Sequence, residues 1–327
     1  MDSFRTELNL KPSRMRLGLK DTFFTMGSCF ANAIGSRLQD FKFKTLVNPF
    51  GTTYNPVSIH QQLGFAVKNE LPTGESYATD GELFFNYHFH SQFSSLNKDE
   101  LSNQLRQIIH QSKFFLIETS CLILTYGTAW VYELKQEQKI VANCHKQQAS
   151  RFEKRLLAQR EIEDSFESVY KIILSHNPDI KIILTVSPVR HVKDTLPLNA
   201  VSKSILRVAC HSLSQRFSNV EYFPAYEIMM DDLRDYRFYK QDRIHPTEEA
   251  EDYIWEKFCH TGFDETTLHF IQTWKEIKLA LAHKPFHPNS KKNLLRLEKL
   301  LGRIESLSKL VDVHFEITQI KKYYQAR

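Results

Sequence analysis

Several features that mark specialised classes of protein are missing from this sequence. Glycine is scarce, at 10 of 327 residues, and no segment has the biased composition of a disordered or fibrous chain. No apolar run approaches the about 18 residues that a membrane-spanning helix requires. The first twenty residues lack the apolar core of a signal peptide. We therefore expect a globular chain without a membrane partner.

Cysteine usage excludes two further classes. The five cysteines are odd in number, widely spaced and never arranged as Cys-x-x-Cys. This pattern fits neither a secreted disulfide scaffold nor a zinc finger. We therefore expect a reduced, cytoplasmic protein without a metal or another cofactor.

A large excess of charge of one sign is missing from most of the chain. The formal net charge is +5, and residues 286–327 alone hold nine Lys or Arg against four Asp or Glu. The preceding residues hold equal numbers of each sign. A neutral body does not attract polyanions, so we expect no nucleic-acid partner.

Apolar strands alternate with amphipathic helices along the chain. The strands are aliphatic throughout, which is typical of burial on both faces of a parallel sheet, and the alternation predicts helices on both faces. The predicted strands cover residues 22–26, 121–127, 181–188 and 220–223. The predicted helices cover residues 29–41, 99–117, 161–176, 198–217 and 246–258.

The carboxyl ends of the predicted strands are where we expect the active site of such a sheet. Four places in the sequence qualify. They are Gly27-Ser28, Gly127-Thr128, Ser187-Pro188 and the loop before residue 246.

The end of the chain has a different pattern. Leucine, isoleucine and valine form an apolar stripe between residues 294 and 311, which predicts one long amphipathic helix or two shorter ones. We divide the chain into a domain at residues 1–260 and a C-terminal helical extension at residues 261–327. The stripe best fits a helix packed on the domain. Oligomerisation through this helix is the alternative, and a membrane-surface helix fits least because the polar face mixes Glu with Lys.

The first chemical motif is TMGSCFA at residues 25–31. A strand ends there, and Ser28 stands where a helix begins, which suits a nucleophile beside backbone N–H groups that face a developing oxyanion. The alternative is that Ser28 only caps the helix. The neighbouring Cys29 is a weaker candidate, because it points inward if Ser28 points outward.

The second motif is QDRIHPT at residues 241–247. Asp242 and His245 lie three residues apart before a helix, and an Asp can hold a His while the His takes a proton from a nucleophile. The alternative is a helix start at His245-Pro246 with Asp242 in a surface ion pair.

The two motifs together match the arrangement of SGNH hydrolases, and residues 27–31 resemble the signature of the GSCFA family within that superfamily. The resemblance covers roughly residues 20–258 and leaves the basic tail outside it. It implies a flavodoxin-like three-layer α/β/α fold with a parallel central sheet. The other segments that resemble the family, in the same order, are NPFGTTYNP (48–56), TYGTAWVY (125–132), ANCHK (142–146), TVSPVRH (185–191) and YFPAYEIMMDDLRDYRFY (222–239).

The resemblance also implies roles for individual residues. Ser28 is expected as nucleophile, His245 as general base and Asp242 as the carboxylate that orients it. The backbone N–H groups of Ser28 and Gly51 are expected to form the oxyanion hole. The implied reaction is hydrolysis of a short-chain O-acyl ester through an acyl-enzyme, or transfer of that acyl group, with an acylated sugar as one candidate substrate.

The chain departs from the superfamily at one position. The superfamily usually places an oxyanion-binding Asn where this chain has Ala129. Thr128, Asn143 or His145 are candidates for a substitute donor. The loss of one such donor costs about 10²–10³ in rate, so a weakly active or inactive module that binds a carbohydrate or acyl ligand is the alternative function.

The remaining candidates are residues of the substrate pocket. Tyr54 and Asn55 share a loop with Gly51 and fit either a pocket or a turn. Arg190 and His191 follow a strand and fit an anionic substrate group, or Arg190 an acidic neighbour. His88 and His90 alternate on an expected strand and fit pocket or structural hydrogen bonds better than a metal site shared with Cys144 and His145.

Overall fold

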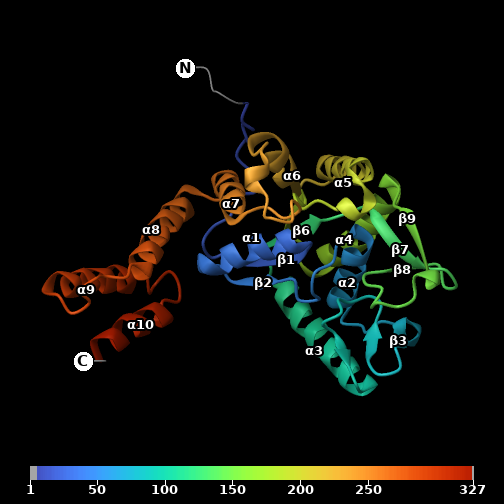
Figure 1. Cartoon of the computed structure of the whole chain (residues 1–327), viewed down its shortest axis with the longest axis horizontal. Helices are drawn as coiled ribbons and strands as arrows, with labels where there is room; N and C mark the ends of the chain where they lie inside the picture. Colours follow the sequence, from blue (N-terminus) through green and yellow to red (C-terminus); the bar gives the residue numbers. More distant parts are fainter. Residues whose placement is uncertain (1–5, 326–327) are drawn as a thin grey trace.

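A five-stranded parallel sheet forms the centre of the computed structural model, which describes residues 6–325 (Figure 1). The strands are β1 (Phe23–Gly27), β2 (Thr45–Val47), β6 (Cys121–Tyr126), β10 (Lys181–Val186) and β11 (Val220–Tyr222). Their order is β11-β10-β6-β1-β2, and every neighbouring pair is parallel. This is the order of flavodoxin-like sheets.

Alternate side chains of each inner strand enter two different hydrophobic cores. On β6, Cys121 and Ile123 pack in one core, whereas Leu122, Leu124 and Tyr126 pack in the other. Because successive side chains of a strand point to opposite faces, both faces of the sheet are buried. The predicted three-layer α/β/α fold is confirmed.

Two groups of helices cover the sheet. The first core contains residues of α1 (Cys29–Asp40) and α7 (Glu248–Gly262). The second core contains residues of α2 (Pro56–Lys68), α3 (Lys98–Ile117), α4 (Gln159–His176) and α5 (Leu196–Arg216).

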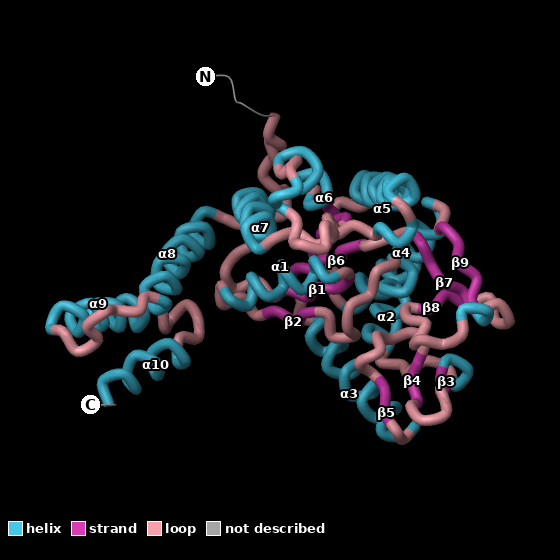
Figure 2. Tube along the Cα trace, viewed as in Figure 1, coloured by secondary structure: helices cyan, strands magenta, loops and turns pink. Residues whose placement is uncertain are grey.

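Two small antiparallel sheets, which the sequence analysis missed, extend the domain at one end (Figure 2). One consists of β3 (Tyr77–Thr79), β4 (Phe84–Asn86) and β5 (Ser94–Ser95). The other consists of β7 (Trp130–Leu134), β8 (Lys139–Val141) and β9 (Phe152–Leu156). The short helical turns of the chain are η1 (Gly74–Ser76), η2 (Ala149–Arg151), η3 (Val192–Asp194), α6 (Ala225–Glu227), η4 (Ile228–Asp232) and η5 (Tyr236–Phe238).

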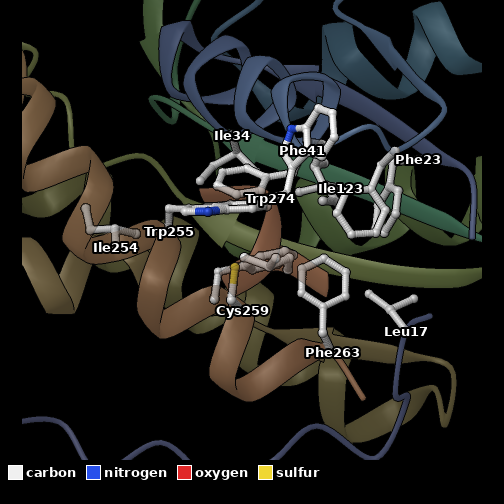
Figure 3. Close-up of a cluster of buried hydrophobic side chains, with 14 of the residues drawn as sticks. Leu17, Phe23, Ile34, Phe41, Ile123, Ile254, Trp255, Cys259, Phe263 and Trp274 are labelled. Carbon is white, nitrogen blue, oxygen red and sulfur yellow. The ribbon is translucent and has the colours of Figure 1, made fainter. Parts of the chain in front are cut away.

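The C-terminal extension is helical, as predicted, and projects from the α/β domain as α8 (Glu265–Ala282), α9 (Lys291–Ser306) and α10 (His314–Gln325) (Figure 1). Its apolar residues continue the first core: Trp274 of α8 lies in the same cluster as Phe41 and Trp255 (Figure 3). The stripe of α9 is also buried there through Leu297, Leu300 and Ile304. None of the helices within residues 6–325 is long and apolar enough to cross a membrane.

Candidate active site

The carboxyl ends of β1 and β6 form the switch point of the sheet, because the chain leaves β1 toward β2 on one side and returns to β6 on the other. Gly27 pairs with Thr125 across these strands and has φ +136°. A Cβ atom at Gly27 would lie 2.1 Å from the Thr125 carbonyl oxygen, so only glycine fits at the point where β1 turns into α1.

Ser28 is turned into the protein at this corner. The side chain is 1% exposed, and its Oγ accepts a hydrogen bond of 3.3 Å from the Phe30 N–H as the N-cap of α1. The Ser28 N–H donates to the Thr125 carbonyl at 3.0 Å. Both groups that the sequence analysis assigned to catalysis therefore make structural hydrogen bonds in this conformation.

Cys29, the first residue of α1, is partly exposed. Its Sγ lies 3.8 Å from the hydroxyl of Tyr54. Burial and the neighbouring Cys29 raise the pKa of Tyr54 to about 12, so the tyrosine stays neutral at pH 7. Within residues 6–325, no acceptor lies against the Cys29 backbone N–H, which leaves one free donor at the start of α1.

Asp242 and His245 form a hydrogen-bonded pair in the loop before α7. The distance from Asp242 Oδ2 to His245 Nδ1 is 2.7 Å. Asp242 Oδ1 also accepts the backbone N–H groups of Ile244 at 2.8 Å and His245 at 3.0 Å. These backbone bonds and then the imidazole hold the pKa of Asp242 well below its usual range, so the carboxylate is ionised at neutral pH.

A cavity of about 350 Å³ is lined by both the start of α1 and the loop before α7. Cys29 and His245 both line it, whereas Ser28 does not. Its other lining residues come mostly from α1 and the start of α7: Phe30, Asn32, Ala33, Ser36, Arg37, Val189, Lys240, Pro246 and Glu251.

Arg190 fixes the His245 loop to the end of β10. Its guanidinium lies over the rings of Tyr239 and Tyr236, at 4.1 and 5.1 Å from their centroids. The Arg190 N–H donates to the carbonyl of Ile244 at 3.3 Å. Stacking of the guanidinium on these aromatic rings accounts for this side chain better than either of the predicted roles, an anionic ligand or an acidic neighbour.

The other predicted oxyanion donors are engaged within the protein. The Gly51 N–H donates to the Asn48 carbonyl at 2.8 Å, and the N–H groups of Gly127 and Thr128 donate to the Tyr54 carbonyl at 2.8 and 3.1 Å. Gly51 has φ +77°, and a Cβ atom there would lie 2.4 Å from the Cβ of His90. Glycine at position 51 therefore leaves room for the side chain of His90.

The residues that follow β6 form hydrogen bonds to Ser202 and to one another. Thr128 Oγ1 lies 3.0 Å from Ser202 Oγ and accepts the Trp130 N–H at 3.1 Å. Ala129 is fully buried, and its N–H donates to the same Ser202 hydroxyl at 2.7 Å. Ser202 thus holds this turn in place.

His191 has an unsatisfied nitrogen at the site. Its Nε2 is buried without a hydrogen-bond partner and lies 3.3 Å from the position that a Cβ of Gly127 would take. Its ring packs edge-to-face against Tyr54, with 5.5 Å between centroids. A buried nitrogen without a partner is costly, so it is a candidate for a ligand contact.

Lys203 was missed by the sequence analysis. It is 1% exposed, and its ammonium donates to the carbonyls of Gly127 at 2.8 Å and Ser187 at 2.6 Å. Burial lowers its pKa to about 7. The signal was a lysine in register with Leu206 and Cys210 on the apolar face of α5.

Five predicted pocket residues have structural contacts elsewhere. Asn55 caps α2 by accepting the Ser58 N–H at 2.8 Å. His145 stacks on Phe85, and its N–H donates to Asn143. His88 packs against Phe65 in a turn after β4. His90 lies two residues further on, outside any strand, so the expected strand with alternating histidines is wrong. Among residues 6–325, no three His, Cys, Asp or Glu side chains group as a metal site would require.

Comparisons with known proteins identify a family. Residues 22–258 match the model of the GSCFA family, which confirms the resemblance seen in the motifs. Residues 274–326 match the model of a GSCFA domain protein, C-terminal domain. The prediction that the basic tail lies outside the family resemblance is therefore wrong. No curated protein sequence matches the chain significantly.

The solved structures that match this chain do so at low sequence identity and low TM-score. One is a carbohydrate esterase family 2 enzyme with a carbohydrate binding domain from Corynascus thermopiles (Myceliophthora fergusii), at 9% identity and TM-score 0.39, covering 80% of this chain and 69% of that one. Another is a carbohydrate esterase family 3 protein from Talaromyces cellulolyticus, at 8% identity and TM-score 0.36, covering 78% and 99%. A third, from Streptococcus pneumonia, is described provisionally as a platelet activating factor; it has 10% identity and TM-score 0.39 and covers 74% and 83%.

Proposed function

The chain belongs to the GSCFA family, and from that premise we propose that it is an SGNH-type hydrolase that cleaves small O-acyl esters or transfers their acyl group. The observation that carries the proposal is the cavity that Cys29 and His245 share. Asp242 is hydrogen-bonded to Nδ1 of the same histidine. A nucleophile, a base and an orienting carboxylate are the parts that covalent acyl transfer requires.

Cys29 is the nucleophile in this proposal, in place of Ser28. Ser28 is buried and caps α1, whereas Cys29 is partly exposed and lines the cavity with His245. Cys29 is also the first residue of α1, so it lies at the positive end of the helix dipole. The free N–H of Cys29 lies beside its own sulfur and serves as an oxyanion donor.

The reaction proceeds through a thioester. His245 Nε2 takes the proton from Cys29 Sγ, and the sulfur attacks the carbonyl carbon of the ester. The tetrahedral intermediate collapses as the C–O bond breaks, and the imidazolium gives the proton to the departing alcohol. Water, deprotonated by His245, then attacks the thioester, which releases the carboxylic acid and restores the thiol. An alcohol in place of water completes acyl transfer.

The substrate is a small ester rather than a long-chain lipid. A cavity of about 350 Å³ stands at the small end of ligand sites and fits a short acyl group on a small alcohol or sugar. The polar side chains around it, Asn32, Ser36, Lys240 and Glu251, suit the hydroxyl groups of a sugar acceptor.

Hydrolysis of 4-nitrophenyl acetate by the full chain tests the proposal. We expect turnover by the wild type, its loss in Cys29→Ala and His245→Ala, and its retention in Ser28→Ala. Iodoacetamide should alkylate Cys29 in the wild type and block turnover. Cys144 is an internal control, because burial raises the pKa of its thiol to about 11 and it should react slowly at pH 7.

Two outcomes would overturn this assignment in different ways. If Ser28→Ala is inactive and Cys29→Ala active, and a fluorophosphonate labels Ser28, the nucleophile is Ser28. If the wild type and both variants show no turnover of any short acyl ester, the site is a binding module for an acyl or carbohydrate ligand.

A further inference from the structure

Few hydrogen-bond donors around Cys29 are free to bind the oxyanion of an acyl intermediate. Among the backbone N–H groups that were predicted to bind the oxyanion, those of Ser28 and Gly51 donate to the carbonyls of Thr125 and Asn48. The N–H groups that follow β6 are bonded to the carbonyl of Tyr54. The Cys29 N–H is free, but typical oxyanion holes use more than one donor.

His191 has a free ring nitrogen at the edge of the sheet where Cys29 lies. The β1–β6 register pairs Gly27 with Thr125, so Cys29 and Gly127, each two residues further on, lie at the same edge of the sheet. His191 Nε2 lies over Gly127, and its ring packs against Tyr54, whose hydroxyl contacts Cys29 Sγ. Because Gly127 has no side chain, Nε2 lies close to the backbone there, beside the carbonyl oxygen and the Cβ of Tyr54.

The backbone holds His191 in this position. Its N–H donates to Asn199 Oδ1 at 2.9 Å, and the guanidinium of the preceding Arg190 lies over two tyrosine rings. A donor that is fixed before the substrate arrives needs no reorganisation when charge develops, which is the condition for effective electrostatic catalysis.

His191 is a donor rather than a second base. Within the described chain it has no carboxylate partner, in contrast to His245 with Asp242. Burial, followed by the positive charges of Lys203, His245 and Lys154, lowers its pKa to about 3. The imidazole is therefore neutral at physiological pH, when it carries one N–H and can donate without taking up a second proton.

We propose that His191 donates a hydrogen bond from Nε2 to the oxyanion of the tetrahedral intermediate and so replaces the donor that is missing at Ala129. The proposal rests on the acyl-transfer function proposed above. It assigns His191 a catalytic role in place of binding an anionic substrate group.

The test compares His191→Phe with the wild type in the hydrolysis of 4-nitrophenyl acetate. Phenylalanine keeps an aromatic ring against Tyr54 and removes the N–H. We expect kcat to fall about 10²–10³-fold, as for the loss of one oxyanion donor, with little change in KM. The rate of Cys29 alkylation by iodoacetamide should stay the same, because the thiol and its base are untouched. His191→Asn, which offers an amide N–H, should recover part of the loss.

Controls separate the possible failures. His176→Phe makes the same replacement at the exposed end of α4 and should leave kcat unchanged. Thermal unfolding of each variant shows whether it folds. If His191→Phe folds and keeps the wild-type kcat while Cys29→Ala is inactive, the donor role is wrong and the acyl-transfer function stands. If the wild type itself neither turns over nor is alkylated at Cys29, the underlying function has failed.

Discussion

Asp242 holds both the ring and the backbone of His245. One carboxylate oxygen lies 2.7 Å from His245 Nδ1, and the other accepts the His245 backbone N–H at 3.0 Å. Because the lowered pKa of Asp242 keeps it ionised, it can only accept, and Nδ1 must carry the proton. The free lone pair of the neutral imidazole is therefore on Nε2, which is the form a general base requires.

Asp242→Asn should disrupt this arrangement without removing the side chain. The amide can donate its N–H₂ to Nδ1, which favours the tautomer with the proton on Nε2 and leaves the base without a lone pair there. We expect kcat for a short acyl ester to fall about 10³–10⁴-fold at nearly unchanged stability. Asp235→Asn is the matched control, because Asp235 caps a nearby turn by accepting the Arg237 N–H. A fully active Asp242→Asn would remove Asp242 from the mechanism.

Gly27→Ala should unfold the corner that carries the site. The residue has φ +136°, and the new Cβ would meet the Thr125 carbonyl at 2.1 Å. The backbone strain alone costs about 1–3 kcal/mol, and the clash forces β1 away from β6. We expect a large drop in the free energy of unfolding in urea and loss of esterase activity.

Gly302→Ala tests the same replacement where it should help. Gly302 lies inside α9 and has no heavy atom within 4 Å of its added Cβ. Alanine is favoured over glycine in a helix by about 0.5–1 kcal/mol, so this variant should be slightly more stable. Equal effects of the two variants would contradict the role of the Gly27 conformation.

Much of the fold could be predicted from the sequence, because the inner strands are continuous aliphatic runs. β6 and β10 lie within one residue or two of their predicted ends. β2 was missed because it has three half-buried residues and carries little pattern. The two small antiparallel sheets were missed for the same reason, since strands of two to five residues with mixed burial resemble loops.

The site was predictable where it is local in sequence. Asp242 and His245 are three residues apart, so one loop is enough to pair them. The choice between Ser28 and Cys29 depends on the corner after Gly27, where the extended backbone of Ser28 directs Oγ to the cap of α1. The unpaired nitrogen of His191 results from packing between segments far apart in sequence, and no local pattern reveals it.

His60 should make the protein sensitive to mild acid. It is buried between Ser165 and Tyr126, which lie 3.0 and 2.7 Å from its two ring nitrogens, and burial lowers its pKa to about 3. The folded protein keeps it neutral, whereas the unfolded chain takes up a proton below its ordinary pKa of 6.5. Its contribution to stability is thus complete above pH 6.5 and is lost progressively as the pH falls from 6.5 toward 3.

His60→Gln should weaken this pH dependence. At pH 5 the unfolded chain lies 1.5 pH units below the ordinary pKa, which corresponds to about 2 kcal/mol. The measurement is urea unfolding of both proteins at pH 7 and pH 5. Between these two pH values, the free energy of unfolding should decrease by about 2 kcal/mol more in the wild type than in His60→Gln. His88 and His191, whose pKa values burial also lowers, contribute equally to both proteins. Parallel decreases in the two proteins would show that His60 does not titrate this way.

Trp274 should tie the C-terminal extension to the stability of the whole domain. It is 1% exposed in α8, in the same core as Phe41 and Trp255 (Figure 3), and its Nε1–H donates to the Asp40 carbonyl at 2.9 Å. Replacement of a buried tryptophan by alanine costs about 3–5 kcal/mol. Because the core is shared, Trp274→Ala should shift one cooperative urea transition of the full chain to lower concentration.

Trp274→Phe and Phe286→Ala calibrate that result. Trp274→Phe keeps most of the apolar surface and leaves the Asp40 carbonyl without its donor, so it should cost about 1–3 kcal/mol. Phe286 is 99% exposed between α8 and α9, and its replacement should change nothing. If Trp274→Ala instead creates a second transition and leaves the first in place, α8–α10 unfold independently. The leucines of α9 that are buried against α8 would then be free for the oligomerisation that the sequence allowed, and a concentration-dependent mass of the full chain would reveal it.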